Sequence, residues 1–141
     1  MRYRVSRLTF KSKNLDVNKK LLRISDARHN PIVHYNSPSR SCQLVELKGR
    51  ALNLIKQCDY DVKEIPLQRN DLFLIYTDGV TEAINENQEL FEESRLIQAV
   101  EEVASKSADA VIQNVKSSLA AFMGKAKQTD DVLVIAIKAT G

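Results

Sequence analysis

Residues 72–83 read Leu-Phe-Leu-Ile-Tyr-Thr-Asp-Gly-Val-Thr-Glu-Ala, and this stretch determines how the rest of the chain is interpreted. The apolar run at 72–76 is typical of a strand that is covered on both faces. Asp78 follows this strand, and Gly79 then allows a sharp turn of the backbone into a helical segment. We therefore expect the Asp78 carboxylate at the rim of a packed core.

A second apolar strand is predicted at 132–137, directly after Asp130 and Asp131. If the two strands pair antiparallel, the end of the first lies beside the start of the second, so both acidic positions share one rim. Taken alone, Asp78 is better explained as an ordinary turn residue, and Asp130 with Asp131 is as ambiguous. Because carboxylate oxygens suit Mg²⁺ and Mn²⁺, the two positions together predict a metal centre with Asp78, Asp130 and Asp131 as candidate ligands.

The remaining segments predict short strands first and helices later. Strands are indicated at 5–10, 21–24, 32–35 and 43–47, with turns at 30–31 and 36–39. Apolar residues at helical spacing predict a helix over 93–104 and a second one after Ser107, which ends at Gly124. This order predicts an α+β fold, an antiparallel β-sandwich of two sheets flanked by helices.

Length and composition indicate one soluble domain over residues 1–141. Hydrophobic residues make up 43% and charged residues 28% of the chain, which is ordinary for a globular protein. No apolar run approaches the roughly 20 residues that cross a bilayer, so no membrane partner is expected. Cys42 and Cys58 are too few for a disulfide framework or a zinc cluster, and we interpret them as free thiols in the cytoplasm.

The charges are distributed unevenly along the chain. Residues 1–70 hold 15 Lys and Arg against 6 Asp and Glu, a net +9, whereas residues 71–141 hold 6 against 12, a net −6. A basic half can attract phosphate groups, nucleic acid or an acidic partner, and the alternative is a plain solvated surface. No nucleic-acid-binding motif is present, so nucleic acid is the least favoured partner.

Three segments together resemble a known family. They are residues 72–83, then Phe91 with Arg95 and Leu96, then Gln128-Thr129-Asp130-Asp131. Their pattern resembles the C-terminal half of SpoIIE-type serine phosphatases, which belong to the metal-dependent protein phosphatase 2C (PPM) superfamily. Weaker matches lie upstream, at 27–31 and at Gly49 with Leu52. The resemblance covers the chain from about residue 20 to 138.

The resemblance implies a chemistry and a partner. In this superfamily two Mn²⁺ or Mg²⁺ ions activate a hydroxide that attacks phosphoserine or phosphothreonine. By position, Asp78 would bind one ion, Asp130 the other, and Asp131 would orient its neighbour. The implied substrate is a phosphorylated protein, such as an anti-sigma-factor antagonist in bacterial partner-switching. His29 would be a structural hydrogen-bonding residue near the site.

The sequence also departs from the family pattern. Its only glycines are at 49, 79, 124 and 141, so no Gly-Gly-Asp-x-x-Asp element, whose first Asp bridges both metals in the family, precedes residue 49. We therefore expect an N-terminally truncated domain, about the last two-thirds of a phosphatase, which binds metal weakly alone. Family glycines are replaced by Arg28, Asn53 and Glu92, each at a cost on the order of 1 kcal/mol if its turn is left-handed. Leu133 replaces a Thr or Ser.

Two functional hypotheses follow. The chain is either the catalytic part of a protein serine/threonine phosphatase or an inactive phosphatase-like module for binding or oligomerisation. The second hypothesis includes a homodimer, because sheet edges without a partner strand invite pairing with another copy.

Overall fold

The computed structural model describes residues 15–16, 21–25, 30–46 and 62–140, and the statements below refer to these residues. They form seven strands and three helices. The strands are β1 (Leu15–Asp16), β2 (Leu21–Ser25), β3 (Ile32–Asn36), β4 (Ser41–Val45), β5 (Val62–Pro66), β6 (Leu72–Tyr76) and β7 (Val134–Lys138). The helices are α1 (Asp78–Thr81), α2 (Glu92–Glu101) and α3 (Ala108–Met123).

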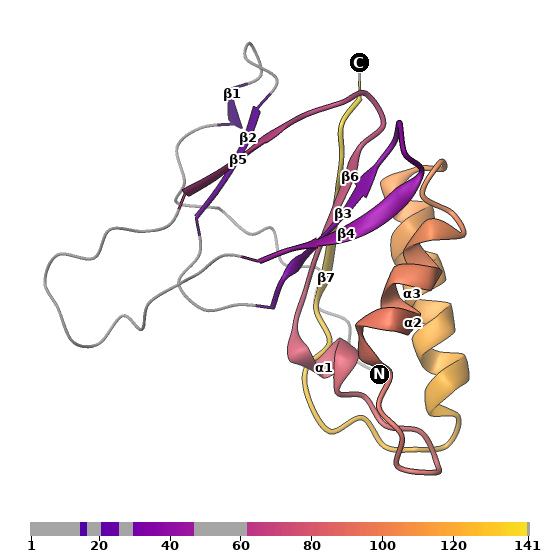
Figure 1. The fold of residues 1–141 in the computed structure, drawn as a ribbon. Helices are drawn as coiled ribbons and strands as arrows, with labels where there is room; N and C mark the ends of the chain where they lie inside the picture. Colours follow the sequence, from indigo (N-terminus) through magenta and orange to yellow (C-terminus); the bar gives the residue numbers. More distant parts are fainter. Residues whose placement is uncertain (1–14, 17–20, 26–29, 47–61, 141) are drawn as a thin grey trace, which may run out of the picture.

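The strands form two antiparallel sheets, of four strands in the order β4-β3-β6-β7 and of three in the order β1-β2-β5. Figure 1 shows α2 and α3 covering one side of the four-stranded sheet, with the three-stranded sheet on the other side. This arrangement confirms the predicted α+β fold, in which antiparallel sheets pack with helices.

Strand β6 lies in the middle of the core because its alternate residues point to opposite faces. Leu72, Leu74 and Tyr76 are buried in the cluster that includes the helices. Phe73 is buried on the other face, in a cluster that includes Leu22 and Ile65 of the three-stranded sheet. The prediction that residues 72–76 are covered on both faces is thus confirmed.

Strand β7 differs from the prediction in two respects. It begins at Val134 rather than at residue 132, and it ends at Lys138 rather than at residue 137. All five of its residues are half-buried. It is the edge strand of its sheet among the described residues, so it has a strand neighbour, β6, on one side only.

Helix α3 begins and ends as the sequence predicts, whereas α2 ends at Glu101, three residues before the predicted end at 104. Ser107 caps α3, its Oγ accepting a hydrogen bond from the Ala110 N–H at 3.2 Å. Gly124 ends the helix with a φ of 57°, a left-handed conformation that glycine adopts without strain. The α3 residues buried against the sheet are Val111, Val115, Leu119 and Met123.

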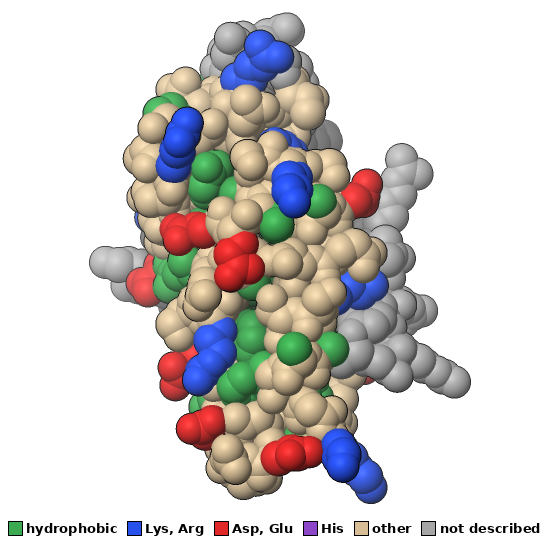
Figure 2. Space-filling model, turned by 90° about the vertical axis from the view of Figure 1, so that its right-hand side faces the viewer, with side chains coloured by type: hydrophobic (Ala, Val, Ile, Leu, Met, Phe, Trp, Pro, Cys, Tyr) green, Lys and Arg blue, Asp and Glu red, His purple; other side chains and the backbone are tan. Residues whose placement is uncertain are grey.

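The helical side of the molecule carries charges of both signs. Figure 2 shows acidic and basic side chains interspersed there, with apolar side chains between them. No helix in the described part of the chain is long and apolar enough to cross a membrane. The predicted strand at 5–10, and the turn residues Arg28, His29, Gly49 and Asn53, lie outside the described residues.

Candidate functional site

The antiparallel pairing of β6 with β7 brings the two acidic positions to the same end of the four-stranded sheet. Tyr76, the last residue of β6, lies opposite Val134, the first residue of β7. The pairing extends one step further, because the Thr77 N–H donates to the Leu133 carbonyl at 3.1 Å. Asp78 and the Asp130-Asp131 pair therefore lie just beyond the ends of neighbouring strands.

The Thr77 side chain joins the two segments. Its Oγ1 donates to the Asp131 carbonyl at 2.8 Å and accepts from the Leu133 N–H at 3.0 Å. A side-chain hydroxyl thus satisfies backbone groups before β7 begins, which explains the later start of that strand. The sequence interpretation gave Thr77 no role, although a hydroxyl residue between a buried strand and an aspartate was a signal for one.

Gly79 is required for a different reason than the sequence suggested. It lies within α1 and its φ is not positive, so no special turn needs it. A Cβ at this position would lie 2.5 Å from the Asp131 carbonyl oxygen and 2.9 Å from its carbon. The glycine therefore permits the backbone of α1 to approach the backbone of Asp131.

The carboxylates at this end of the sheet are exposed and partly free. Asp78 Oδ1 accepts from the Gly79 N–H at 3.0 Å, and Asp130 Oδ1 accepts from the Asp131 N–H at 2.7 Å. The second oxygen of each accepts no hydrogen bond from the described residues. Residues 128–131 line an open pocket of about 370 Å³ beside them.

The donor chemistry suits a hard cation, but the described residues do not complete a metal site. Exposed carboxylate oxygens are the ligands that Mg²⁺ and Mn²⁺ prefer. Within the described ranges, however, no group of three His, Cys, Asp or Glu side chains could hold a metal ion. The roles of Asp78, Asp130 and Asp131 as metal ligands stay predictions.

Arg95 holds the segment that follows α1. Its Nη1 donates to the carbonyls of Leu90 at 2.9 Å and Phe91 at 3.2 Å, and its guanidinium lies 4.7 Å from the centre of the Phe122 ring. Glu92 has a φ of 63°, which confirms that this position has the left-handed conformation expected where the family has glycine. Arg95 thus connects the loop next to the acidic end with α3.

Tyr76, two residues before Asp78, has no hydrogen-bond partner for its buried hydroxyl among the described residues. Burial, and then the charge of Glu93, raises the pKa of this hydroxyl above its usual range. Tyr76 is therefore neutral at physiological pH and serves as a core residue.

A buried polar network lies at the opposite end of β6. His34 Nε2 lies 3.2 Å from Asp71 Oδ2, and the Gln43 amide nitrogen lies 3.0 Å from His34 Nδ1. The His34 ring also stacks on Phe73 with 4.3 Å between ring centres. The structure thus places His34 in the interior, next to a residue 37 positions away in the sequence.

The sequence matches one protein family over nearly its whole length. The family model described as "Stage II sporulation protein E (SpoIIE)" matches residues 8–140. The chain belongs to the SpoIIE family. The resemblance inferred from Tyr76 to Gly79 and from Asp130 with Asp131 is thereby confirmed.

Individual relatives of this SpoIIE-family chain agree with the assignment. "Phosphoserine phosphatase RsbU" of Bacillus subtilis is 27% identical over 122 residues, which is 86% of this chain and 36% of that protein. The chain thus spans about a third of this curated relative.

Solved structures show the same fold. The SiaA-PP2C domain of Pseudomonas aeruginosa superposes with a TM-score of 0.71 at 22% identity, over 87% of this chain and 48% of that one. The RsbU and RsbW domains of Rv1364c from Mycobacterium tuberculosis give a TM-score of 0.67 at 21% identity, over 89% of this chain and 34% of that one. The SpoIIE-family chain therefore has a fold of the protein phosphatase 2C type.

Proposed function

We propose that this protein is a metal-dependent protein serine/threonine phosphatase of the RsbU/SpoIIE type. The observation that carries the proposal is the close approach of the α1 backbone at Gly79 to the backbone of Asp131, which the Thr77 hydroxyl also joins. It sets Asp78 and the Asp130-Asp131 pair at the same end of the sheet. Membership of the SpoIIE family and the similarity to a phosphoserine phosphatase support it.

In this proposal Asp78 and Asp130 each bind one Mn²⁺ or Mg²⁺ ion. When bound, such ions lower the pKa of a coordinated water and neutralise phosphoryl oxygens. Asp131 positions its neighbour, since its backbone N–H donates to Asp130 Oδ1 at 2.7 Å and leaves Oδ2 free for a ligand. The remaining ligands come from solvent, substrate or residues outside the described part of the protein.

The proposed substrate is a phosphoserine or phosphothreonine side chain of another protein. The exposed acidic end of the sheet supports this, because a phosphorylated side chain on a partner's surface can reach it. The similarity to RsbU, and to a protein that combines RsbU and RsbW domains, favours a partner of the anti-sigma-factor antagonist class.

The test is the Mn²⁺-dependent release of phosphate from a phosphoserine peptide by the full-length protein. Asp78→Asn and Asp130→Asn should each lower kcat/KM by about 100-fold or more, because each removes a metal ligand. Asp131→Asn should cost much less, because it keeps the backbone N–H that holds Asp130 Oδ1. Asp109→Asn, on the exposed first turn of α3, is the matched control and should retain full activity.

Two results would contradict the proposal. One is turnover that survives Asp78→Asn. The other is a folded full-length protein that shows no turnover at saturating Mn²⁺; this would favour the inactive binding or oligomerisation module.

A further inference from the structure

Thr77 stands at a position where its hydroxyl would ordinarily serve its own helix. It is the N-cap residue of α1, and a threonine there commonly accepts a hydrogen bond from an N–H of the first turn. In this protein the Thr77 side chain makes no such bond. Its hydroxyl instead donates to the Asp131 carbonyl and accepts from the Leu133 N–H, more than fifty positions away. Helix capping therefore does not explain this hydroxyl.

The Asp131 carbonyl that Thr77 holds is also fixed from a second side. A Cβ on Gly79 would lie 2.5 Å from this oxygen, so the α1 backbone packs directly against it. The next residue, Val132, is buried in the core cluster that includes the helices. The backbone is thus anchored directly after Asp131, whereas the side chains of Asp130 and Asp131 are exposed.

The anchored backbone determines where the Asp130 carboxylate lies. Asp130 Oδ1 accepts from the Asp131 N–H at 2.7 Å, which ties the carboxylate to the backbone of the residue that Thr77 holds. Gln128 Nε2 donates to the Asp130 carbonyl at 2.7 Å and so holds the same peptide unit from the other side. The connection therefore runs from the Thr77 hydroxyl through the Asp131 backbone to the Asp130 carboxylate.

We propose that Thr77 is a positioning residue, whose hydroxyl fixes the Asp131 backbone and thereby orients the Asp130 carboxylate. The contact needs a donor and an acceptor on one atom, which the hydroxyl of threonine or serine supplies and valine lacks. The orientation of the carboxylate is a property of the protein alone. Its use in binding Mn²⁺ rests on the proposed function, and groups that orient a metal ligand typically change metal affinity about 10- to 100-fold.

The first test is NMR of the ¹⁵N-labelled full-length protein without metal. In Thr77→Val the Leu133 N–H loses its acceptor, so its hydrogen exchange should be faster by about tenfold or more. The amide signals of Asp130 and Asp131 should shift as well. Thr77→Ser retains the hydroxyl and should restore the slow exchange and the wild-type signals.

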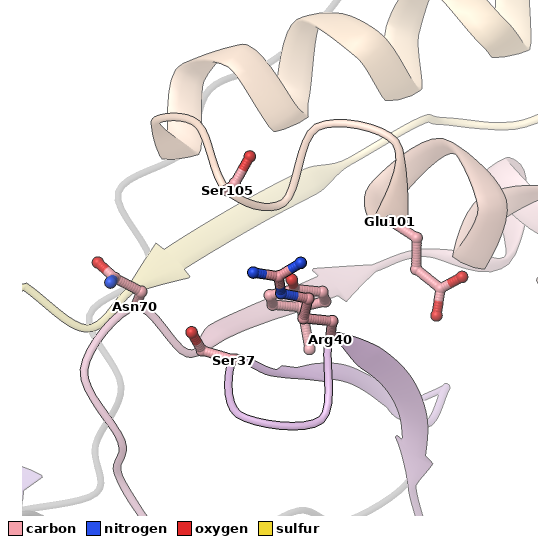
Figure 3. A pocket seen from close by; sticks show the side chains of 6 residues that line it. Ser37, Arg40, Asn70, Glu101 and Ser105 are labelled. Carbon is pink, nitrogen blue, oxygen red and sulfur yellow. The ribbon is translucent and has the colours of Figure 1, made fainter.

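The opposite end of the sheet supplies the internal reference for this measurement. A pocket of about 470 Å³ lies there, lined by Tyr35, Ser37, Arg40, Asn70, Glu101 and Ser105 (Figure 3). Beside it, the Ser37 N–H donates to the fully buried Asp71 carboxylate at 2.8 Å. The exchange of the Ser37 amide should therefore be the same in the wild type and in both Thr77 variants.

The second test is the Mn²⁺ affinity of the same proteins. Thr77→Val should weaken it by about tenfold or more, and Thr77→Ser should restore it. Thr81→Val is the matched control, because it also removes a threonine hydroxyl near Asp78. Thr81 is buried, and its Oγ1 donates within α1, to the Asp78 carbonyl at 3.4 Å. Thr81→Val should keep the wild-type affinity.

Four results would overturn the proposal. They are unchanged Asp130 and Asp131 signals in Thr77→Val, an unchanged Mn²⁺ affinity in this variant, equal effects of Thr77→Ser and Thr77→Val, and an equal loss of affinity in Thr81→Val. A wild-type protein that binds no Mn²⁺ would instead contradict the proposed function. The spectra without metal would then still decide whether the Thr77 hydroxyl positions the Asp130-Asp131 pair.

Discussion

Gly79 permits the close approach of α1 to the segment before β7, because it has no side chain. In Gly79→Ala the new methyl group would lie 2.5 Å from the Asp131 carbonyl oxygen, so one backbone segment must move. We expect the free energy of unfolding to fall by about 2 kcal/mol and Mn²⁺ affinity to fall with it. Urea denaturation and metal titration measure the two effects.

The control for this variant is Gly124→Ala. Gly124 lies at the end of α3, and its positive φ makes the substitution destabilising. It is distant in sequence from Asp78, and a Cβ added at this position would not meet Asp131. It should lower stability and leave Mn²⁺ affinity unchanged. A loss of affinity in both variants would show that the Gly79 effect is merely global.

Glu92 offers a stabilising substitution. Its φ of 63° is strained for a residue with a Cβ, so Glu92→Gly should raise the free energy of unfolding by roughly 0.5–1 kcal/mol. Gln98→Gly, at an exposed position inside α2, should instead lower it by about 1 kcal/mol. Chemical denaturation measures the free energy of unfolding of both variants. A lower value for Glu92→Gly than for the wild type would contradict the prediction.

Cys42 should be an unreactive thiol. Burial, together with the charge of Glu101 and its hydrogen bond, raises the pKa of Cys42 to about 12. An acid whose pKa is raised stays protonated to higher pH, and the thiolate is the reactive form. In a Cys58→Ser variant, alkylation by iodoacetamide at pH 8.5 should be more than about 100-fold slower than that of a free cysteine.

The pH profile of this alkylation provides the control. Half-maximal reactivity near pH 8.5 in the folded protein would contradict the prediction. Glu101→Gln should move the profile toward lower pH, because it removes one of the causes of the raised pKa.

At the scale of elements, Asp71 links β3, β6 and the two turns beside them. Its carboxylate accepts bonds from Ser37 N–H, Gln68 N–H and the His34 ring. In Asp71→Asn the amide nitrogen would face one of these donors, so a buried N–H loses its partner, at a cost of about 2–3 kcal/mol. Denaturant unfolding should show this loss, whereas Asp109→Asn should change stability by less than about 0.5 kcal/mol. An equally small change for Asp71→Asn would show that the network is dispensable.

The elements also show what a sequence can and cannot predict. The apolar run of β6 and the helix signals at Ser107 and Gly124 are local, so their predictions agree with the structure. The predicted start of β7 was wrong by two residues, because the Thr77 side chain, 56 positions away in the sequence, accepts a hydrogen bond from Leu133. The pocket that Arg40, Asn70 and Ser105 help to line was not predicted, because segments that are distant in the sequence form it.

At the scale of the whole molecule, the four-stranded sheet separates two chemistries. One end carries the exposed carboxylates of Asp78, Asp130 and Asp131. The other end carries the pocket that Arg40, Asn70 and Ser105 help to line. The family pattern could indicate the first end because its residues stand in two short segments. No such family pattern marks the residues at the other end of the sheet, so only the structure shows that they lie together.

Metal binding should be visible in the stability of the whole protein. A ligand that binds only the folded state stabilises it, by about 2.7 kcal/mol at a concentration of 100 Kd. Mn²⁺ should therefore raise the Tm of the wild type, and EDTA should reverse the shift. Asp78→Asn should lose most of the increase, whereas Asp109→Asn should keep it. An equal increase in Asp78→Asn would exclude Asp78 as a ligand.

The pairing of β6 with β7 has a consequence for the stage of folding at which the acidic end of the sheet forms. Asp78 and Asp130 are 52 positions apart (130 − 78), and the two long helices, α2 and α3, form between them. Closing so long a loop costs entropy, which contacts between the strands recover only once β7 is in place. A nascent chain can build β6, α2 and α3 and still have no acidic site. The site would then appear in a single late step, together with the last strand of the sheet.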